Sequence, residues 1–253
     1  MQVRSDAPET RGSAGDPRRG AGELGVVLVT GGASGLGAAV VDAVAEAGGK
    51  PVVLDRVEPE RATRGDALDF EQVDLADGRA AEATVRRVAD RLGEINAVVT
   101  CAGIDSCGTL ADVPAKDWER VVRVNLLGTV AVVRAALPSL QATHGRVVTV
   151  ASTLGLRAVS DATAYCASKF GVVGFTRALA TELQGKVGVT LLVPGGMDTP
   201  FFDTRDEQYK PPPGMKMNDP GNVAAAVVFA LHQPAGSEVR ELVVCPSVES
   251  SWP

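Results

Sequence analysis

The stretch that most constrains the fold is residues 24–37, where an apolar run rich in valine leads into a cluster of glycines. An uninterrupted run of this kind is typical of a strand buried on both faces of a parallel sheet. Gly31, Gly35 and Gly37 follow it. Because glycine has no Cβ, it permits a sharp turn and a close approach to a ligand, and the next helix directs unpaired N–H groups outward. The pattern predicts strand, turn and helix, with a seat for a pyrophosphate.

A second strand follows in the expected order. Good helix formers occupy residues 38–47, and the apolar run 51–54 ends at Asp55. An acid about 20 residues beyond the glycine turn is where dinucleotide-binding folds hydrogen-bond the ribose of the adenosine half. The alternative is a glycine-rich turn without a ligand. The whole series in order favours the dinucleotide site.

Composition excludes several classes of protein. The net charge is −6 and the sequence pI is about 5.1, whereas nucleic-acid binding needs a basic face. No apolar run reaches the roughly 20 residues of a membrane-spanning helix. Four cysteines without Cys-x-x-Cys spacing and only two histidines predict no metal site. We expect a cytoplasmic protein with free thiols, because no secretory signal is visible.

The rest of the chain alternates between strand and helix patterns. Residues 1–23, rich in charge, Gly and Pro, predict a disordered extension, and residues 24–253 a single catalytic domain. Residues 197–217 lack periodicity and contain several prolines, which favours a mobile flap over a site. Further strands are expected at 70–74, 95–100, 146–151, 187–193 and 239–245, and helices at 77–92, 115–140, 161–184 and 221–232.

This alternation predicts an α/β fold: a single-domain, Rossmann-type, doubly wound parallel sheet of about seven strands with helices on both faces. Ligands on such a sheet bind at the carboxyl ends of its strands. Residues of special type fall at or just past those expected ends, namely Gly31, Asp55, Asp74, Gly103, Ser152 and Pro194.

Four polar residues in the second half of the chain suggest catalysis. Tyr165 and Lys169 lie four apart on one expected helix, and therefore share a face. Asn125 is unusual in the middle of an apolar helix, because its side chain competes for backbone groups. Ser152 ends a strand. Each also has a structural explanation: a surface pair for the tyrosine and lysine, a satisfied core amide for Asn125, and a cap or turn for Ser152 and for Thr199.

Taken together, these marks resemble the short-chain dehydrogenase/reductase family in its short single-domain branch, over residues 24–244. They are Thr30-Gly31-x-x-x-Gly35-x-Gly37, Asp74, Cys101-Ala102-Gly103, Asn125, Ser152, Tyr165-x-x-x-Lys169, and Pro194-Gly195 with Thr199.

The resemblance implies an oxidoreductase that transfers a hydride between a nicotinamide cofactor and a secondary alcohol or ketone. Asn125, Ser152, Tyr165 and Lys169 would form the catalytic group. The residues it implies around the cofactor are Gly31, Ser34, Gly35, Leu36, Gly37, Asp55, Arg56, Asp74 near the adenine, Leu75, Ala102, Gly103, Tyr165, Lys169, Pro194, Gly195, Met197 and Thr199 near the nicotinamide amide. It also implies a homotetramer or homodimer built on the two long helices.

The chemistry of these residue types agrees with that assignment. A phenol beside the alkoxide formed by hydride transfer can serve as general acid, or as base in reverse. The ordinary tyrosine pKa of about 10 is high for a base, so we expect the Lys169 ammonium and the positive nicotinamide to lower the pKa of Tyr165. Ser152 would hydrogen-bond the reacting oxygen, and Asn125 would hold a water that links Lys169 to solvent.

Two positions depart from the family pattern. Thr100-Cys101 stands where an Asn-Asn pair is usual, and residues 243–253 lack the Gly-Gly ending common in acyl-carrier-protein reductases. Catalysis is expected to survive the first departure. The second argues against identity with those reductases.

The choice of cofactor depends on Asp55 and Arg56. The Asp55 carboxylate would accept hydrogen bonds from both ribose hydroxyls and repel a 2′-phosphate, which favours NAD. Arg56 could instead clamp the phosphate of NADP, or be a solvated charge at the strand end. The competing functions are an NADPH-dependent biosynthetic ketoreductase and a non-catalytic NAD-binding regulatory module. A sugar epimerase or dehydratase would need a larger carboxyl-terminal domain.

The substrate pocket is expected between residues 104–110, residues 153–160 and the flap. These segments mix apolar side chains such as Leu154 and Phe201 with charges such as Arg205, so the sequence leaves the substrate open.

Overall fold

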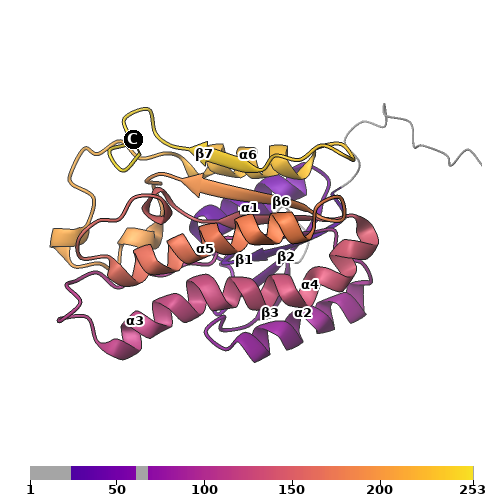
Figure 1. The fold of residues 1–253 in the computed structure, drawn as a ribbon, viewed down its shortest axis with the longest axis horizontal. Coiled ribbons are helices and arrows are strands. Elements are labelled where there is room, and N and C mark those ends of the chain that lie inside the picture. Colours follow the sequence, from indigo (N-terminus) through magenta and orange to yellow (C-terminus); the bar gives the residue numbers. More distant parts are fainter. Residues whose placement is uncertain (1–23, 61–67, 253) are drawn as a thin grey trace, which may run out of the picture.

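The computed structural model describes residues 24–60 and 68–252, so the extension expected at residues 1–23 lies outside it. Its centre is a sheet of seven parallel strands in the order β3-β2-β1-β4-β5-β6-β7, flanked by helices on both faces (Figure 1). The predicted doubly wound fold is confirmed. The strands are β1 (Val26–Thr30), β2 (Lys50–Asp55), β3 (Asp69–Gln72), β4 (Ala97–Thr100), β5 (Arg146–Val150), β6 (Gly188–Pro194) and β7 (Glu241–Val244).

The alternation of side chains in β1 explains why the strand is uniformly apolar. Val26 and Leu28 point to one face of the sheet, and Val27 and Val29 point to the other. Both faces are buried because helices cover both of them. The helices are α1 (Gly35–Glu46), α2 (Gly78–Leu92), α3 (Ala115–Val122), α4 (Thr129–Thr143), α5 (Thr163–Glu182) and α6 (Pro220–Leu231).

The two cores are built from different helices. On one face, α2, α4 and α5 contribute buried residues such as Val85, Val132 and Leu179. On the other face, α1 and α6 contribute Val40 and Val227. The strand order reverses at β1, whose neighbours are β2 and β4, so a crevice is expected at the carboxyl ends of β1 and β4.

The single long helix expected at 115–140 is corrected by the structure. Residues Arg123–Gly128 form a π-helical segment, η1, between α3 and α4, and α4 continues to Thr143. Such π segments occur often at functional sites. The apolar pattern continues through the segment, so periodicity does not separate it from an α-helix, and only Asn125 stood out there in the sequence.

The combined helix Ala115–Thr143 is long and apolar enough to cross a membrane by length and composition, but it is 50% buried inside the protein. A helix buried in a protein core meets the same two criteria. It is therefore weak evidence for a membrane span.

The segment 197–217 contains two short 3-10 helices, Pro200–Phe202 and Glu207–Tyr209. Its ends are joined by an isolated bridge between Met197 and Asn218, with hydrogen bonds from Asp198 N to Asn218 O (2.9 Å) and from Asn218 N to Gly196 O (2.9 Å). The segment is thus a closed loop that begins and ends beside the carboxyl end of β6.

Candidate active site at the carboxyl edge of the sheet

The turn after β1 approaches neighbouring backbone too closely for side chains. A Cβ on Gly31 would lie 2.7 Å from Ala102 Cα, and a Cβ on Gly37 would lie 2.0 Å from Gly31 O. Gly31 and Gly35 also have positive φ, at 69° and 53°. The glycines are therefore required by this turn, which leaves backbone exposed where a pyrophosphate would bind.

The start of α1 is available to an anion. Ser34 occupies the N-cap position, and its side chain makes no capping hydrogen bond. Leu36, in the first turn, is buried in the core. The first N–H groups of α1 and the Ser34 hydroxyl thus fit the phosphate seat that the sequence predicts.

Asp55 lies at the end of β2 and faces the same turn. Its Oδ2 accepts a hydrogen bond from Ala33 N (3.1 Å), and its Oδ1 accepts one from Val57 N (3.2 Å). The carboxylate is therefore held beside the glycine turn with acceptor capacity left for a ribose. Arg56 is exposed.

Asp74 and Leu75 follow β3. The Asp74 carboxylate forms an ion pair with Arg120 (2.9 Å) and accepts a hydrogen bond from Ala76 N (2.9 Å). Burial raises the pKa of Asp74, but the Ala76 and Arg120 hydrogen bonds and the nearby arginine charges outweigh it and hold the pKa below its ordinary value. The Leu75 side chain is buried in the core, so any cofactor contact from Leu75 would come from its main chain.

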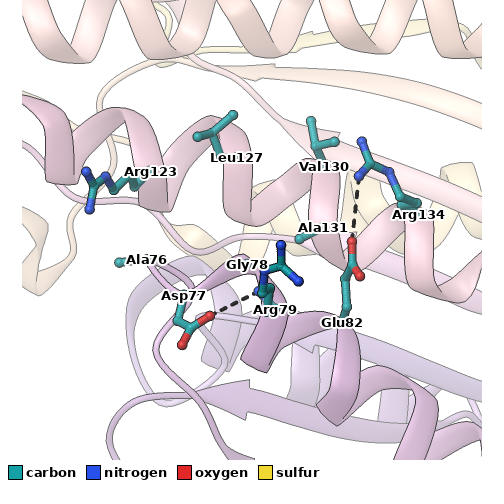
Figure 2. Close-up of a pocket in the computed structure, with 10 residues that line it drawn as sticks. All are labelled: Ala76, Asp77, Gly78, Arg79, Glu82, Arg123, Leu127, Val130, Ala131 and Arg134. Carbon is teal, nitrogen blue, oxygen red and sulfur yellow. Dashed lines mark hydrogen bonds and ion pairs between the residues drawn. The ribbon is translucent and has the colours of Figure 1, made fainter.

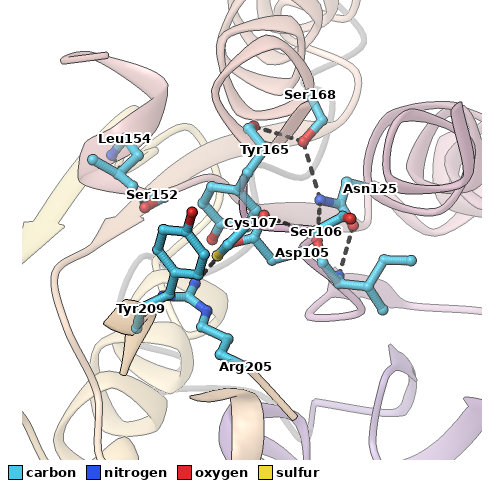
Figure 3. Close-up of polar contacts among 11 residues, drawn as sticks. Asp105, Ser106, Cys107, Asn125, Ser152, Leu154, Tyr165, Ser168, Arg205 and Tyr209 are labelled. Carbon is cyan, nitrogen blue, oxygen red and sulfur yellow. Dashed lines mark hydrogen bonds and ion pairs between the residues drawn. The ribbon is translucent and has the colours of Figure 1, made fainter. Parts of the chain in front are cut away.

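Ser152, just after β5, is drawn with Tyr165 of α5 in Figure 3, and Lys169 follows one turn later on the same helix. The Ser152 Oγ accepts a hydrogen bond from Leu154 N (3.1 Å), so this residue also caps the short 3-10 helix Thr153–Gly155. Tyr165 is 9% exposed, and the Ser152 side chain is close enough to its phenol to act on the pKa of Tyr165, which it lowers. Ser152 therefore caps this short helix, as its structural interpretation expected.

Lys169 lies behind the tyrosine ring. Its Nζ is 5.6 Å from the centre of the Tyr165 ring and donates a hydrogen bond to Val150 O (2.9 Å). The side chain is buried, which excludes the surface pair considered from the sequence. Burial lowers the pKa of Lys169 to about 8, although the Cys101 and Asp105 charges oppose that shift.

The direction of the Tyr165 pKa differs from the expectation. We expected a lowered value, but burial raises the pKa of Tyr165 well above its ordinary range, and the Ser152 hydrogen bond and the Arg205 charge only oppose this. The reason is that the ring is enclosed by α5 and the 197–217 segment, so desolvation of the phenolate outweighs the nearby positive charges. A sequence gives the charges but not the desolvation.

Asn125 belongs to η1, and its amide is fully engaged. Its Oδ1 accepts a hydrogen bond from Ile104 N (2.8 Å), and its Nδ2 donates to Ile104 O (2.9 Å) and to Ser168 Oγ (3.0 Å). A Cβ on Gly103 would lie 3.7 Å from Asn125 Oδ1 and 3.5 Å from Lys169 Nζ. Asn125 therefore ties the loop after β4 to α5, close to Lys169.

The turn after β6 completes the site. A Cβ on Gly35 would lie 3.3 Å from Thr199 Cβ, so the predicted nicotinamide and phosphate segments are neighbours. Thr199 precedes the 3-10 helix Pro200–Phe202, but its side chain makes no cap hydrogen bond. The structure thereby brings Pro194, Gly195, Met197 and Thr199 to the same edge as the β1 turn.

Two features of the site were not predicted. Asp105, in the loop after β4, forms a 2.7 Å ion pair with Arg205 of the 197–217 segment. Glu249, near the chain end, accepts a hydrogen bond from Gly196 N (2.8 Å). The sequence placed Arg205 and residues 104–110 in the pocket wall, but no periodic signal links partners so far apart in the chain.

A groove of about 560 Å³ lies between the start of α2 and the η1–α4 helix (Figure 2). Its side chains include an Arg134–Glu82 ion pair (3.7 Å) and the N-cap Asp77. None of the four predicted catalytic residues lines it. Among the described residues, no cluster of three or more His, Cys, Asp or Glu could hold a metal ion.

Comparison with known proteins identifies the family. The family model for short chain dehydrogenases matches residues 25–210. The hydroxy(phenyl)methylsuccinyl-CoA dehydrogenase subunit BbsD of Thauera aromatica is 34% identical over 87% of this chain and 94% of its own length. The 2,5-dichloro-2,5-cyclohexadiene-1,4-diol dehydrogenase LinX of Sphingobium indicum is 32% identical over 81% of this chain and 87% of its own.

A solved actinorhodin polyketide ketoreductase with NADPH is similar in structure, with a TM-score of 0.77 and 31% identity, covering 87% of this chain and 95% of that one. Sequence, fold and relatives agree. The chain belongs to the short-chain dehydrogenase/reductase family, as an oxidoreductase that transfers a hydride between a nicotinamide cofactor and an alcohol or ketone.

Proposed function

We propose that Tyr165 is the general acid and base of this oxidoreductase, with Ser152, Lys169 and Asn125 as its catalytic partners. The observation that carries the proposal is the buried side chain of Tyr165, which has the Ser152 side chain near its phenol and the Lys169 Nζ 5.6 Å from the centre of its ring. Ser152, which follows β5, and Lys169, which lies on α5, thus both lie close to the Tyr165 side chain at the carboxyl edge of the sheet.

The bound nicotinamide supplies or accepts the hydride. In reduction, Tyr165 donates its proton to the oxygen of the reacting carbonyl, and Ser152 stabilises that oxygen through a hydrogen bond. The phenol of Tyr165 is protonated at neutral pH, so it can donate this proton in the reductive direction. Lys169, held by Val150 O, places its positive charge near the phenolate that remains.

Asp55 favours NAD over NADP in this proposal. Its carboxylate is fixed at the edge of the glycine turn by the N–H groups of Ala33 and Val57. A 2′-phosphate at this place would meet a negative charge. The alternative is an NADPH-dependent biosynthetic ketoreductase that uses the exposed Arg56, and the similarity to a ketoreductase solved with NADPH favours that alternative.

Exposed apolar side chains on the two long helices support a homotetramer or homodimer. Leu127 is 54% exposed and Phe170 is 44% exposed.

We further propose a cytoplasmic location, a small-molecule alcohol or carbonyl substrate, and a single catalytic domain at 24–253 in which 197–217 is the substrate flap.

Replacing Tyr165 by Phe tests the central assignment. We expect at least about a hundredfold loss of kcat, with NADH affinity and thermal stability near those of the wild type, because only the reacting hydroxyl is removed. Rates are measured with a panel of ketones and secondary alcohols. Turnover by Tyr165→Phe at the wild-type rate would overturn the assignment. A wild type that binds NADH tightly yet turns over nothing would favour the regulatory module.

Fluorescence titration with NADH and NADPH tests the choice of cofactor without any substrate. We expect tighter binding of NADH, and a shift towards NADPH in Asp55→Ala because the repelling carboxylate is removed. Arg56→Ala serves as the matched variant and should leave the NADH affinity unchanged. Tighter binding of NADPH by the wild type, lost in Arg56→Ala, would establish the ketoreductase alternative.

A further inference from the structure

A buried ion pair joins the flap to the loop after β4. The Asp105 Oδ2 lies 2.7 Å from the Arg205 Nη2, and the two side chains are only 5% and 17% exposed. The other Asp105 oxygen, Oδ1, accepts a hydrogen bond from Ser106 N (2.7 Å). Figure 3 shows the pair with Cys107, whose Sγ donates a hydrogen bond to Asp105 Oδ2 (3.4 Å), and with Tyr165.

Aromatic rings connect Arg205 to the proposed catalytic tyrosine. The guanidinium carbon is 5.1 Å from the centre of the Phe201 ring and 4.6 Å from that of Phe202. The Phe201 ring is in turn 5.7 Å from the Tyr165 ring. Asp105 holds Arg205 in place, and Arg205 packs on the Phe201 ring. Asp105 therefore also helps to position this ring against Tyr165.

We propose that Asp105 and Arg205 are specificity-determining residues, which hold Phe201 against Tyr165 and give the substrate pocket an electrically neutral wall. The site then takes ketones and secondary alcohols without charge near the reacting carbon in preference to those that carry a carboxylate there. This inference rests on the proposed function of Tyr165.

The physical reason is the cost of an unpaired charge in a poorly solvated place. Asp105 neutralises Arg205, so a substrate carboxylate gains no counter-ion from Arg205 and would lie near the Asp105 charge. The Arg205 Nε is buried and has no hydrogen-bond partner among the described residues, so the guanidinium retains donor capacity. Without the Asp105 charge, the same arginine would become a carboxylate receptor.

The test compares two ketones that differ in charge and by one methyl group, 4-acetylbenzoate and its methyl ester, with wild type and Asp105→Asn. The asparagine keeps the shape of the side chain and an acceptor for Ser106 N but removes the charge. We expect the wild type to prefer the ester, and Asp105→Asn to shift the ratio of kcat/KM towards the acid by about tenfold or more.

Glu241→Gln is the matched control. It removes a carboxylate from another arginine pair, Glu241 with Arg177 (2.7 Å), whose side chains are 42% and 54% exposed and which lies at β7. This variant should leave the ratio unchanged. An unchanged ratio in Asp105→Asn would overturn the inference, whereas the proposed function would stand as long as the wild type reduces either ketone.

Chymotrypsin cleavage provides a measurement that needs no turnover. Phe201, Phe202 and Tyr209 all lie in the flap, and a loosened flap should be cut several-fold faster in Asp105→Asn and in Arg205→Ala than in the wild type. Cleavage of both variants at the wild-type rate would contradict the inference. Faster cleavage in a protein that reduces no ketone at all would support the flap contact and count against the proposed function.

Discussion

Burial acts in opposite directions on the two central side chains of the site. It raises the pKa of Tyr165, and it lowers the pKa of Lys169 from 10.5 to about 8. Desolvation disfavours the charged form of each residue, so the phenol stays neutral and the ammonium is easily lost. The expected lowering of the Tyr165 pKa relied on the Lys169 charge and on a bound positive nicotinamide, whereas in the protein alone burial outweighs the nearby charges.

The lowered pKa of Lys169 predicts a dependence of stability on pH. Between pH 8 and 10.5 the unfolded state holds more protons on this lysine than the folded state, so the free energy of unfolding rises with pH over that window. Below about pH 8 the full penalty of the buried charge is present. Lys169→Met removes this titration.

The difference in unfolding free energy, wild type minus Lys169→Met, should therefore rise by about 3 kcal/mol between those two pH values. Urea denaturation at a series of pH values measures it. Other titrating groups are common to both proteins and cancel to first order. A difference that stays constant with pH would show that Lys169 is not desolvated as described.

At the scale of single elements, η1 is the feature that places Asn125. The Asn125 side chain hydrogen-bonds both the N–H and the C=O of Ile104. The Asn125 backbone O accepts a hydrogen bond from Thr129 Oγ1 (2.9 Å). The end of η1 packs closely on the turn after β3, since a Cβ on Gly128 would lie 2.8 Å from both Leu75 Cβ and Leu75 O. The glycine is thus a packing requirement of the π segment.

We expect Gly128→Ala to lower the free energy of unfolding by about 1–3 kcal/mol, because backbone of Leu75 must move. Gly174→Ala in α5 is the matched substitution. A Cβ there meets nothing within 4 Å, so its expected effect is a gain of roughly 0.5–1 kcal/mol from helix propensity. Denaturant midpoints of both variants measure this. A Gly128→Ala protein as stable as the wild type would contradict the packing described.

At the scale of the whole molecule, the end of the chain reinforces the site. Glu249 accepts hydrogen bonds from Gly196 N (2.8 Å) and from Ser251 N (2.9 Å). The Ser251 hydroxyl lies 2.6 Å from Thr153 Oγ1, next to Ser152. Residues after β7 therefore connect the turn after β6 to the turn after β5.

Loss of this contact should weaken cofactor binding. We expect Glu249→Ala to raise the Kd for NADH several-fold, because the Gly195-Gly196 turn loses its anchor, while the fold remains intact. Glu249→Gln keeps one acceptor oxygen, so its Kd for NADH should lie between those of the wild type and Glu249→Ala. Fluorescence titration measures the affinities, and near-UV circular dichroism checks the fold. Equal affinity for NADH in the wild type, Glu249→Ala and Glu249→Gln would mean that the residues after β7 cover the site without supporting cofactor binding.

The sequence by itself determined the sheet, its layers and the edge where ligands bind. The reason is local: strand periodicity, the glycine turn after β1 and the polar residues at strand ends are set by neighbours in the chain. Parallel strands then bring those ends to one edge, and helical spacing puts Tyr165 and Lys169 on one face of α5. The grouping of these two residues with Ser152 was predicted from the family resemblance.

Only the tertiary structure decided the π segment, the burial that sets the pKa values of Tyr165 and Lys169, and the Asp105–Arg205 and Glu249 contacts. Each depends on surfaces that meet after the sheet has formed. Asp105 and Arg205 are 100 positions apart and belong to irregular segments. No repeat or spacing in the chain predicts this contact, because the packing of the core, and not the local sequence, determines which distant residues lie together.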